Sequence, residues 1–325
     1  MVIIMKKIIR NILTSVICLT LLMGSFASLA GCEKKEPAHT GTEVICTNYA
    51  ALQLVSGVMT NYLDNGGDGV YSIILLGKEG QDMHSYEPTA RDITNLAGAD
   101  IVICTGAETW LDGAISSSGN KDLIRVSMME VCDTMESDHD HDHDHGGEDC
   151  NLIGQDEHVW LSVENAIRIT QAIEDGLCRV DEKNAAVLQM GGDAFRSELV
   201  ALKDDYAAMM ADAVRDTVVI ADRHPFAYLF RELGLNCIAA FPGCSSENSA
   251  SFATQTMLIE KTRELELPYV FIMEGSDGKV AEVVATETGA EILTLNSLQV
   301  VTDFENTTYL TVMKSNLENL KKALQ

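Results

Sequence analysis

Apolar residues fall into short runs in the first half of the chain, and segments with helical spacing separate these runs. The runs are rich in Val and Ile, which is typical of buried strands. The predicted strands cover residues 43–47, 70–76, 100–106 and 123–127, and the predicted helices cover 50–63 and 89–99. Near-continuous apolar strands that alternate with helices indicate a parallel sheet with both faces covered.

The same alternation starts again at residue 217. Its predicted strands cover residues 217–222, 235–240, 269–273 and 291–295, and its predicted helices cover 225–233, 250–265, 278–288 and 306–324. Residues 181–214, between the two series, are rich in helix formers and are interrupted only by Gly191-Gly192. A helix of about 30 residues spans roughly 45 Å, which is long enough to connect two lobes.

The pattern as a whole predicts an α/β fold of two lobes. Each lobe is a mostly parallel sheet with flanking helices, one long backbone helix joins the lobes, and a ligand site lies in the cleft between them. The expected boundaries are an N-terminal lobe at 43–178, a linking helix at 179–214 and a C-terminal lobe at 215–325.

The N-terminus has the pattern of a secreted lipoprotein. Lys6, Lys7 and Arg10 precede an apolar run at 12–23, and the segment closes with Leu-Ala-Gly followed by Cys32. We interpret residues 1–31 as a signal peptide, Cys32 as a lipidated residue and 32–42 as a tether. An ordinary signal with a chance cysteine is the alternative. The expected location is outside the cytoplasm, anchored to the cell membrane.

Charge and cysteine content restrict the possible partners. The formal charge of -26 becomes -29 once the three basic residues of the signal are removed, which argues against nucleic acid as a partner. Seven cysteines remain beyond the signal and Cys32, an odd number. Cys132 and Cys150 flank a histidine-rich stretch, and whether they pair is left open.

Histidines are the side chains that point to chemistry. Four of the eight, His139, His141, His143 and His145, lie in the low-complexity run at 138–149, and His39 lies in the tether. Only His84, His158 and His224 lie in structured context, each where a strand or loop leads into a helix. Since neutral imidazole suits zinc, we expect these three to form a metal site.

Several motifs support this interpretation. The segments DMHSYEPTARD at 82–92, DEHVWL at 156–161, DRHPFAY at 222–228, ENSA at 247–250 and YLTVMKSNLENL at 309–320 occur in this order. Together they resemble the cluster A-I solute-binding proteins of bacterial ABC transporters for zinc and manganese, specifically the zinc type. The resemblance covers residues 43–325, although Met83 and Glu157 replace two prolines of the family pattern.

The resemblance implies a function, a ligand and a partner. It implies a monomer that binds Zn²⁺ through His84, His158 and His224 and delivers it to the membrane permease of an ABC importer, without catalysis. Manganese-type relatives carry a carboxylate at the third ligand position, so imidazole there favours Zn²⁺ over Mn²⁺. Asn296 and Glu274 are the candidates for a fourth ligand or for supporting residues.

Other roles remain open from sequence alone. The run at 138–149 is interpreted as a low-affinity zinc collector, with a second metal site or a dispensable insert as alternatives. Glu87, Asp222 and Glu247 are candidates for carboxylates that orient the ligands, and Trp160 and Phe226 are expected to pack around the site. A zinc-dependent hydrolase and a surface adhesin are the competing functions.

Overall fold

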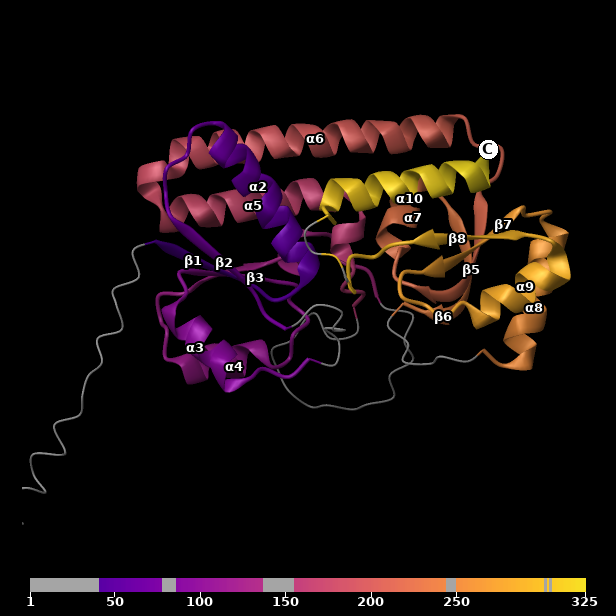
Figure 1. Ribbon diagram of the computed structural model, residues 1–325, viewed down its shortest axis with the longest axis horizontal. Coiled ribbons are helices and arrows are strands. Elements are labelled where there is room, and N and C mark those ends of the chain that lie inside the picture. Colours follow the sequence, from indigo (N-terminus) through magenta and orange to yellow (C-terminus); the bar gives the residue numbers. More distant parts are fainter. Residues whose placement is uncertain (1–40, 78–85, 137–154, 244–249, 301–302, 304–305) are drawn as a thin grey trace, which may run out of the picture. The chain divides into compact units, whose positions relative to one another are not determined.

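The computed structural model describes residues 41–77, 86–136, 155–243, 250–300, 303 and 306–325 (Figure 1). The predicted signal peptide, most of the tether, and the low-complexity run at 138–149 fall outside these ranges. Within them, no helix is long and apolar enough to cross a membrane.

Two four-stranded parallel sheets form the framework. The first contains β1 (Thr42–Cys46), β2 (Tyr71–Leu75), β3 (Ile101–Cys104) and β4 (Ile124–Ser127). The second contains β5 (Thr217–His224), β6 (Asn236–Pro242), β7 (Tyr269–Met273) and β8 (Glu291–Leu295). The strand orders, β2-β1-β3-β4 and β6-β5-β7-β8, follow the same scheme. The predicted α/β fold is confirmed, and every predicted strand is present.

Helices cover these sheets. Those of the first series are α2 (Tyr49–Asp64), α3 (Ala90–Gly98), α4 (Leu111–Ser118), α5 (Val163–Val180) and α6 (Ala185–Ala211). Those of the second are α7 (Ala227–Leu233), α8 (Phe252–Glu264), α9 (Lys279–Thr288) and α10 (Tyr309–Leu324). Short 3₁₀ helices occur at Met129–Val131, Val159–Leu161 and Glu182–Asn184. The sequence pattern does not predict α4, whereas α5 is the helix that was expected to follow His158.

Neighbouring strand residues enter different cores because successive side chains point to opposite faces of a sheet. Val44 of β1 and Val218 of β5 belong to one large cluster that both halves share. Ile45 packs into a separate core with residues of α3 and α4, and Val219 into another with residues of α8 and α9. Apolar residues on both faces account for the continuous Val/Ile runs that predict the strands.

Helix α6 packs against both halves and contributes to the core that they share. It has 27 residues, or about 40 Å of helix, and it contacts α2 and α5 as well as α7 and α10 (Figure 1). The hydroxyl of Tyr206 donates to the carbonyl of Met313 in α10 over 2.7 Å. The predicted long helix at 179–214 is therefore shorter than expected, since α5 ends at Val180 and a 3₁₀ turn precedes α6.

Two glycines let α6 approach its neighbours closely. A Cβ on Gly191 would lie 2.7 Å from the carbonyl oxygen of Val58 and 2.7 Å from the amide nitrogen of Tyr62 in α2. A Cβ on Gly192 would overlap the Glu174 carboxylate of α5. The Gly191-Gly192 pair therefore does not interrupt the helix but provides its contact surface.

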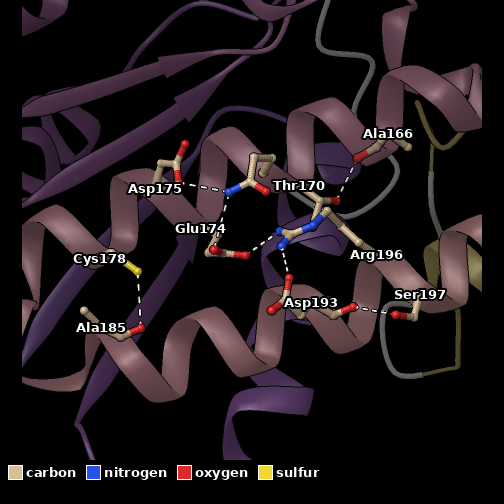
Figure 2. A network of polar contacts seen from close by, with 10 residues as sticks. Ala166, Thr170, Glu174, Asp175, Cys178, Ala185, Asp193, Arg196 and Ser197 are labelled. Carbon is tan, nitrogen blue, oxygen red and sulfur yellow. Dashed lines mark hydrogen bonds and ion pairs between the residues drawn. The ribbon is translucent and has the colours of Figure 1, made fainter.

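A buried ion pair joins α5 and α6 beside Gly192 (Figure 2). Glu174 is only 4% exposed and binds the guanidinium of Arg196, which also binds Asp193. The side-chain amide of Gln171 donates to Glu174 over 3.4 Å. A buried carboxylate with these partners has little freedom to move away from an added methyl group.

Replacing Gly192 with alanine therefore tests the close packing. We expect Gly192→Ala to lower the free energy of unfolding by about 1–3 kcal/mol, because the new methyl overlaps Glu174. Urea unfolding followed by circular dichroism measures this change.

Gly113→Ala is the matched control within helix α4. No atom lies within 4 Å of a Cβ built there, so helix propensity should stabilise this variant by up to about 1 kcal/mol. Equal stability of the two variants would contradict the packing argument.

Candidate metal centre

The described residues include two of the three predicted ligands, His158 and His224. His84 lies outside them, as do His139, His141, His143, His145, Cys32 and Glu247. Among the residues that the structure covers, no group of three or more His, Cys, Asp or Glu side chains is arranged to hold a metal ion. The described part of the candidate site consists of His158, His224 and the residues around them.

His158 is fully buried, and Asp156 holds its ring. Oδ1 of Asp156 accepts a hydrogen bond from the backbone N–H of His158 over 2.9 Å and lies 2.7 Å from Nδ1 of the ring. A carboxylate at Nδ1 favours the tautomer with its proton there. Nε2 then keeps the lone pair that a metal ion requires, which is the usual arrangement of a ligating histidine and its carboxylate partner.

The charge state of Asp156 fits this role. Burial alone would raise the pKa of Asp156. Hydrogen bonds from His158, with the positive charge that His158 and His224 can carry, have the larger effect, so the pKa lies below its ordinary value. The carboxylate therefore stays ionised and available to Nδ1.

His224 is the last residue of β5, and a register shift in the β5–β6 pairing precedes it. Asp222 supports the irregular segment, since its carboxylate accepts from the backbone N–H of Arg223 over 2.8 Å and of Met273 over 3.3 Å. The ring centroid of His224 lies 5.1 Å from that of Phe230. Asp222 thus acts on the backbone that carries His224, a setting in which bulges commonly re-aim a side chain.

Tyr228 joins the two segments that flank residues 137–154. Its hydroxyl donates to the carbonyl of Asp156 over 2.6 Å and accepts from the backbone N–H of Met135 over 2.9 Å. The N–H of Asp156 also donates to the carbonyl of Met135, and Glu136 forms an isolated antiparallel bridge with Gln155. Helix α7 thereby fixes the backbone of the residue that orients His158.

Gln299 faces the other side of the His158 ring. Its side-chain nitrogen lies 2.5 Å from Nε2 of His158, and its side-chain oxygen lies 3.2 Å from Oγ of Ser297. Because Asp156 holds the ring proton on Nδ1, Nε2 presents a lone pair, which favours the amide orientation that points the NH₂ group at Nε2. The chain itself thus engages the atom that the sequence predicts as a metal ligand.

Asn296 and Glu274 support the loop that carries Gln299. Oδ1 of Asn296 accepts from the N–H of Leu298 over 2.8 Å. Glu274 accepts from the N–H and the hydroxyl of Ser297 over 2.9 and 2.6 Å, and burial raises the pKa of Glu274. Both residues were candidates for a fourth ligand or for a supporting role, and these contacts suit the supporting role.

Of the two aromatic residues expected to pack around the site, Trp160 lies beside His158. Trp160 is 4% exposed, its ring centroid lies 5.5 Å from that of His158, and its indole N–H donates to the carbonyl of Ser297 over 2.8 Å. Phe226 is fully buried. The indole hydrogen bond connects residues on either side of α6 in the sequence, so the site lies where the two halves meet.

The segment that follows His84 is firmly held. Tyr86 donates its hydroxyl to Asp92 over 2.5 Å and packs edge-on against Trp110, with ring centroids 5.4 Å apart. Asp92 also completes a capping box with Thr89 at the start of α3. Trp110 therefore packs against Tyr86, the first described residue after His84.

Sequence reasoning did not identify the roles of Asp156, Tyr228 and Gln299. A signal existed for Asp156, since the pentapeptide Gly-Gln-Asp-x-His occurs at 80–84 and again at 154–158. An Asp two residues before a His can reach Nδ1 of that ring. The contact between His158 and Gln299 spans 141 positions and has no local signal.

Comparison with known proteins identifies the family to which the chain belongs. The model of the family described as "Zinc-uptake complex component A periplasmic" (ZnuA) matches residues 58–323. The zinc-binding protein AdcA of Streptococcus pyogenes is 26% identical over 303 residues, which cover 89% of this chain and 57% of AdcA. The chain thus matches little more than half the length of that relative.

Two further comparisons agree. The high-affinity zinc uptake system protein ZnuA of Bacillus subtilis is 29% identical over 256 residues, covering 77% of this chain and 80% of the relative. The solved structure of the metal-dependent lipoprotein YcdH of B. subtilis shares the fold with a TM-score of 0.72 and 24% identity, and the match covers 87% of this chain and 99% of YcdH. Since the family model covers most of the chain, this protein belongs to the ZnuA family of zinc-uptake components.

Proposed function

We propose that this protein captures Zn²⁺ outside the cytoplasm and delivers it to the permease of an ABC importer. Family membership and the names of the zinc-binding relatives support the class of cargo. The observation that carries the proposal is the buried His158, whose Nδ1 is held by Asp156 so that Nε2 can ligate a metal. The proposed ligands are His84, His158 and His224.

The choice of zinc over manganese follows from ligand chemistry. Imidazole nitrogen suits Zn²⁺, whereas Mn²⁺ favours carboxylate and other oxygen ligands. Each of the three proposed ligands is an imidazole, and Asp156 is engaged with Nδ1 of His158. The donor set therefore favours Zn²⁺.

The proposed setting is a monomer attached to the cell membrane through lipid on Cys32, with residues 33–42 as a tether. In this role the protein binds Zn²⁺ and transfers it, and it catalyses no reaction. The partner is a membrane permease, which must accept Zn²⁺ from the exposed side of the site.

Histidine variants test the site. His158→Ala and His224→Ala should each weaken Zn²⁺ binding by at least tenfold, because each removes one of the imidazoles that hold the ion. Competition against a zinc chelator measures the affinity, and parallel titration with Mn²⁺ measures the preference. His39→Ala, in the predicted tether, is the control and should bind like the parent protein. Mn²⁺ bound in preference to Zn²⁺ would overturn the assignment.

Asp156→Asn tests how His158 is oriented. The amide can donate to Nδ1 and so move the ring proton to Nε2, where it blocks metal ligation. We expect Zn²⁺ affinity to fall by roughly 10- to 100-fold, the usual effect of losing such a partner. Asp133→Asn removes an exposed carboxylate near the same segment and should leave affinity unchanged. Equal affinities for the two variants would exclude the orienting role of Asp156.

Deletion of residues 138–149 tests the proposed collector. Four imidazoles interleaved with carboxylates should bind several Zn²⁺ ions weakly, so the deletion should lower the stoichiometry and slow uptake when zinc is scarce. Calorimetric titration gives the stoichiometry, and growth in chelator-treated medium reports uptake. If both are unchanged, the segment does not collect zinc.

A further inference from the structure

The metal-facing nitrogen of His158 has a partner within the chain. Asp156 lies at Nδ1, and the amide nitrogen of Gln299 lies 2.5 Å from Nε2. With the proton on Nδ1, Nε2 accepts a hydrogen bond from the Gln299 NH₂ group. A metal ion and this NH₂ group require the same lone pair, so they cannot both engage it.

The contact of Asp156 with Nδ1 sets the orientation of the Gln299 amide, because it leaves on Nε2 a lone pair that the NH₂ group can meet. The amide oxygen lies 3.2 Å from the hydroxyl of Ser297, whose proton Glu274 accepts over 2.6 Å. The oxygen of the amide is therefore directed away from the ring. The contacts favour the orientation that opposes metal binding.

The backbone beside Gln299 is held in an unfavourable conformation. Leu298 has φ 62°, a value at which a non-glycine residue carries strain of about 1–3 kcal/mol, and its side chain is only 1% exposed. The side-chain oxygen of Asn296 accepts from the N–H of Leu298 and the indole of Trp160 donates to the carbonyl of Ser297, so both hold the peptide unit that precedes Leu298. Strain that the surroundings maintain in this way is common where a loop must present one side chain accurately.

We propose that Gln299 is a resident competitor for zinc: its amide occupies Nε2 of His158 in the metal-free protein and must be displaced when the ion binds. This inference rests on the proposed function. A neutral amide is suited to the role, because it satisfies the buried imidazole without adding a charge that would hold the ion. The competition lowers affinity and favours release of the metal to the next carrier.

Gln299→Met tests the competition, since it keeps the length of the side chain and removes the donor. Zn²⁺ should associate faster and bind more tightly by roughly two- to tenfold, which corresponds to the loss of one hydrogen bond. Stopped-flow fluorescence can follow association, because Trp160 lies 5.5 Å from His158. Gln171→Met, on α5, is the matched control and should leave both quantities unchanged.

A second measurement does not depend on metal. The ¹⁵N chemical shift of Nε2 of His158 in the metal-free protein should change in Gln299→Met and remain constant in Gln171→Met. Weaker Zn²⁺ binding by Gln299→Met would show that the amide is a ligand and would overturn the proposal. Unchanged Zn²⁺ binding, or an unchanged chemical shift of Nε2, would show that the amide does not compete and would overturn it as well. Failure of the proposed function would give a different result. The parent protein would then bind no Zn²⁺, or His158→Ala would bind Zn²⁺ as tightly as the parent protein.

Discussion

The close packing of α6 against both halves of the molecule is the constraint on which the rest of the structure depends. The largest apolar core takes residues from both sheets, and α6 contacts helices of each half. Gly191 and Gly192 make this possible, since any side chain there would meet α2 or α5. The two sheets share one core, so neither half buries its apolar face alone. This favours small adjustments of loops over a wide opening between the halves.

The candidate metal centre benefits from that constraint. His158 is held on one side by Asp156 and approached on the other by Gln299, which follows β8 in the second half. Tyr228 fixes the backbone of Asp156 from α7. Because these residues lie on elements attached to one core, their distances can be maintained closely. A metal site requires this, since ligands displaced by a few tenths of an ångström bind much less well.

The strands were predictable because both faces of each sheet are covered, so apolar runs were unbroken. Helix α4 gave a weak signal, since its eight residues include a glycine and three serines. Helix α5 carries clear periodicity in Ile169, Ile173 and Leu177, which agrees with the helix expected after His158. His158 could be predicted from its motif, but its partner Gln299 could not. That contact exists only because the folded chain brings β8 and the His158 segment together.

The bridge at Glu136 and Gln155 has an evolutionary consequence. Tyr228 and the Met135–Asp156 hydrogen bond hold the two ends of the intervening segment together, whatever lies between them. The entropy of closing a loop grows slowly with length, by about 0.6 kcal/mol for each doubling. Residues can therefore be gained or lost between these ends with little effect on the stability of the fold. The number of histidines carried there can change from one lineage to another while the buried imidazole two residues beyond Asp156 keeps its place.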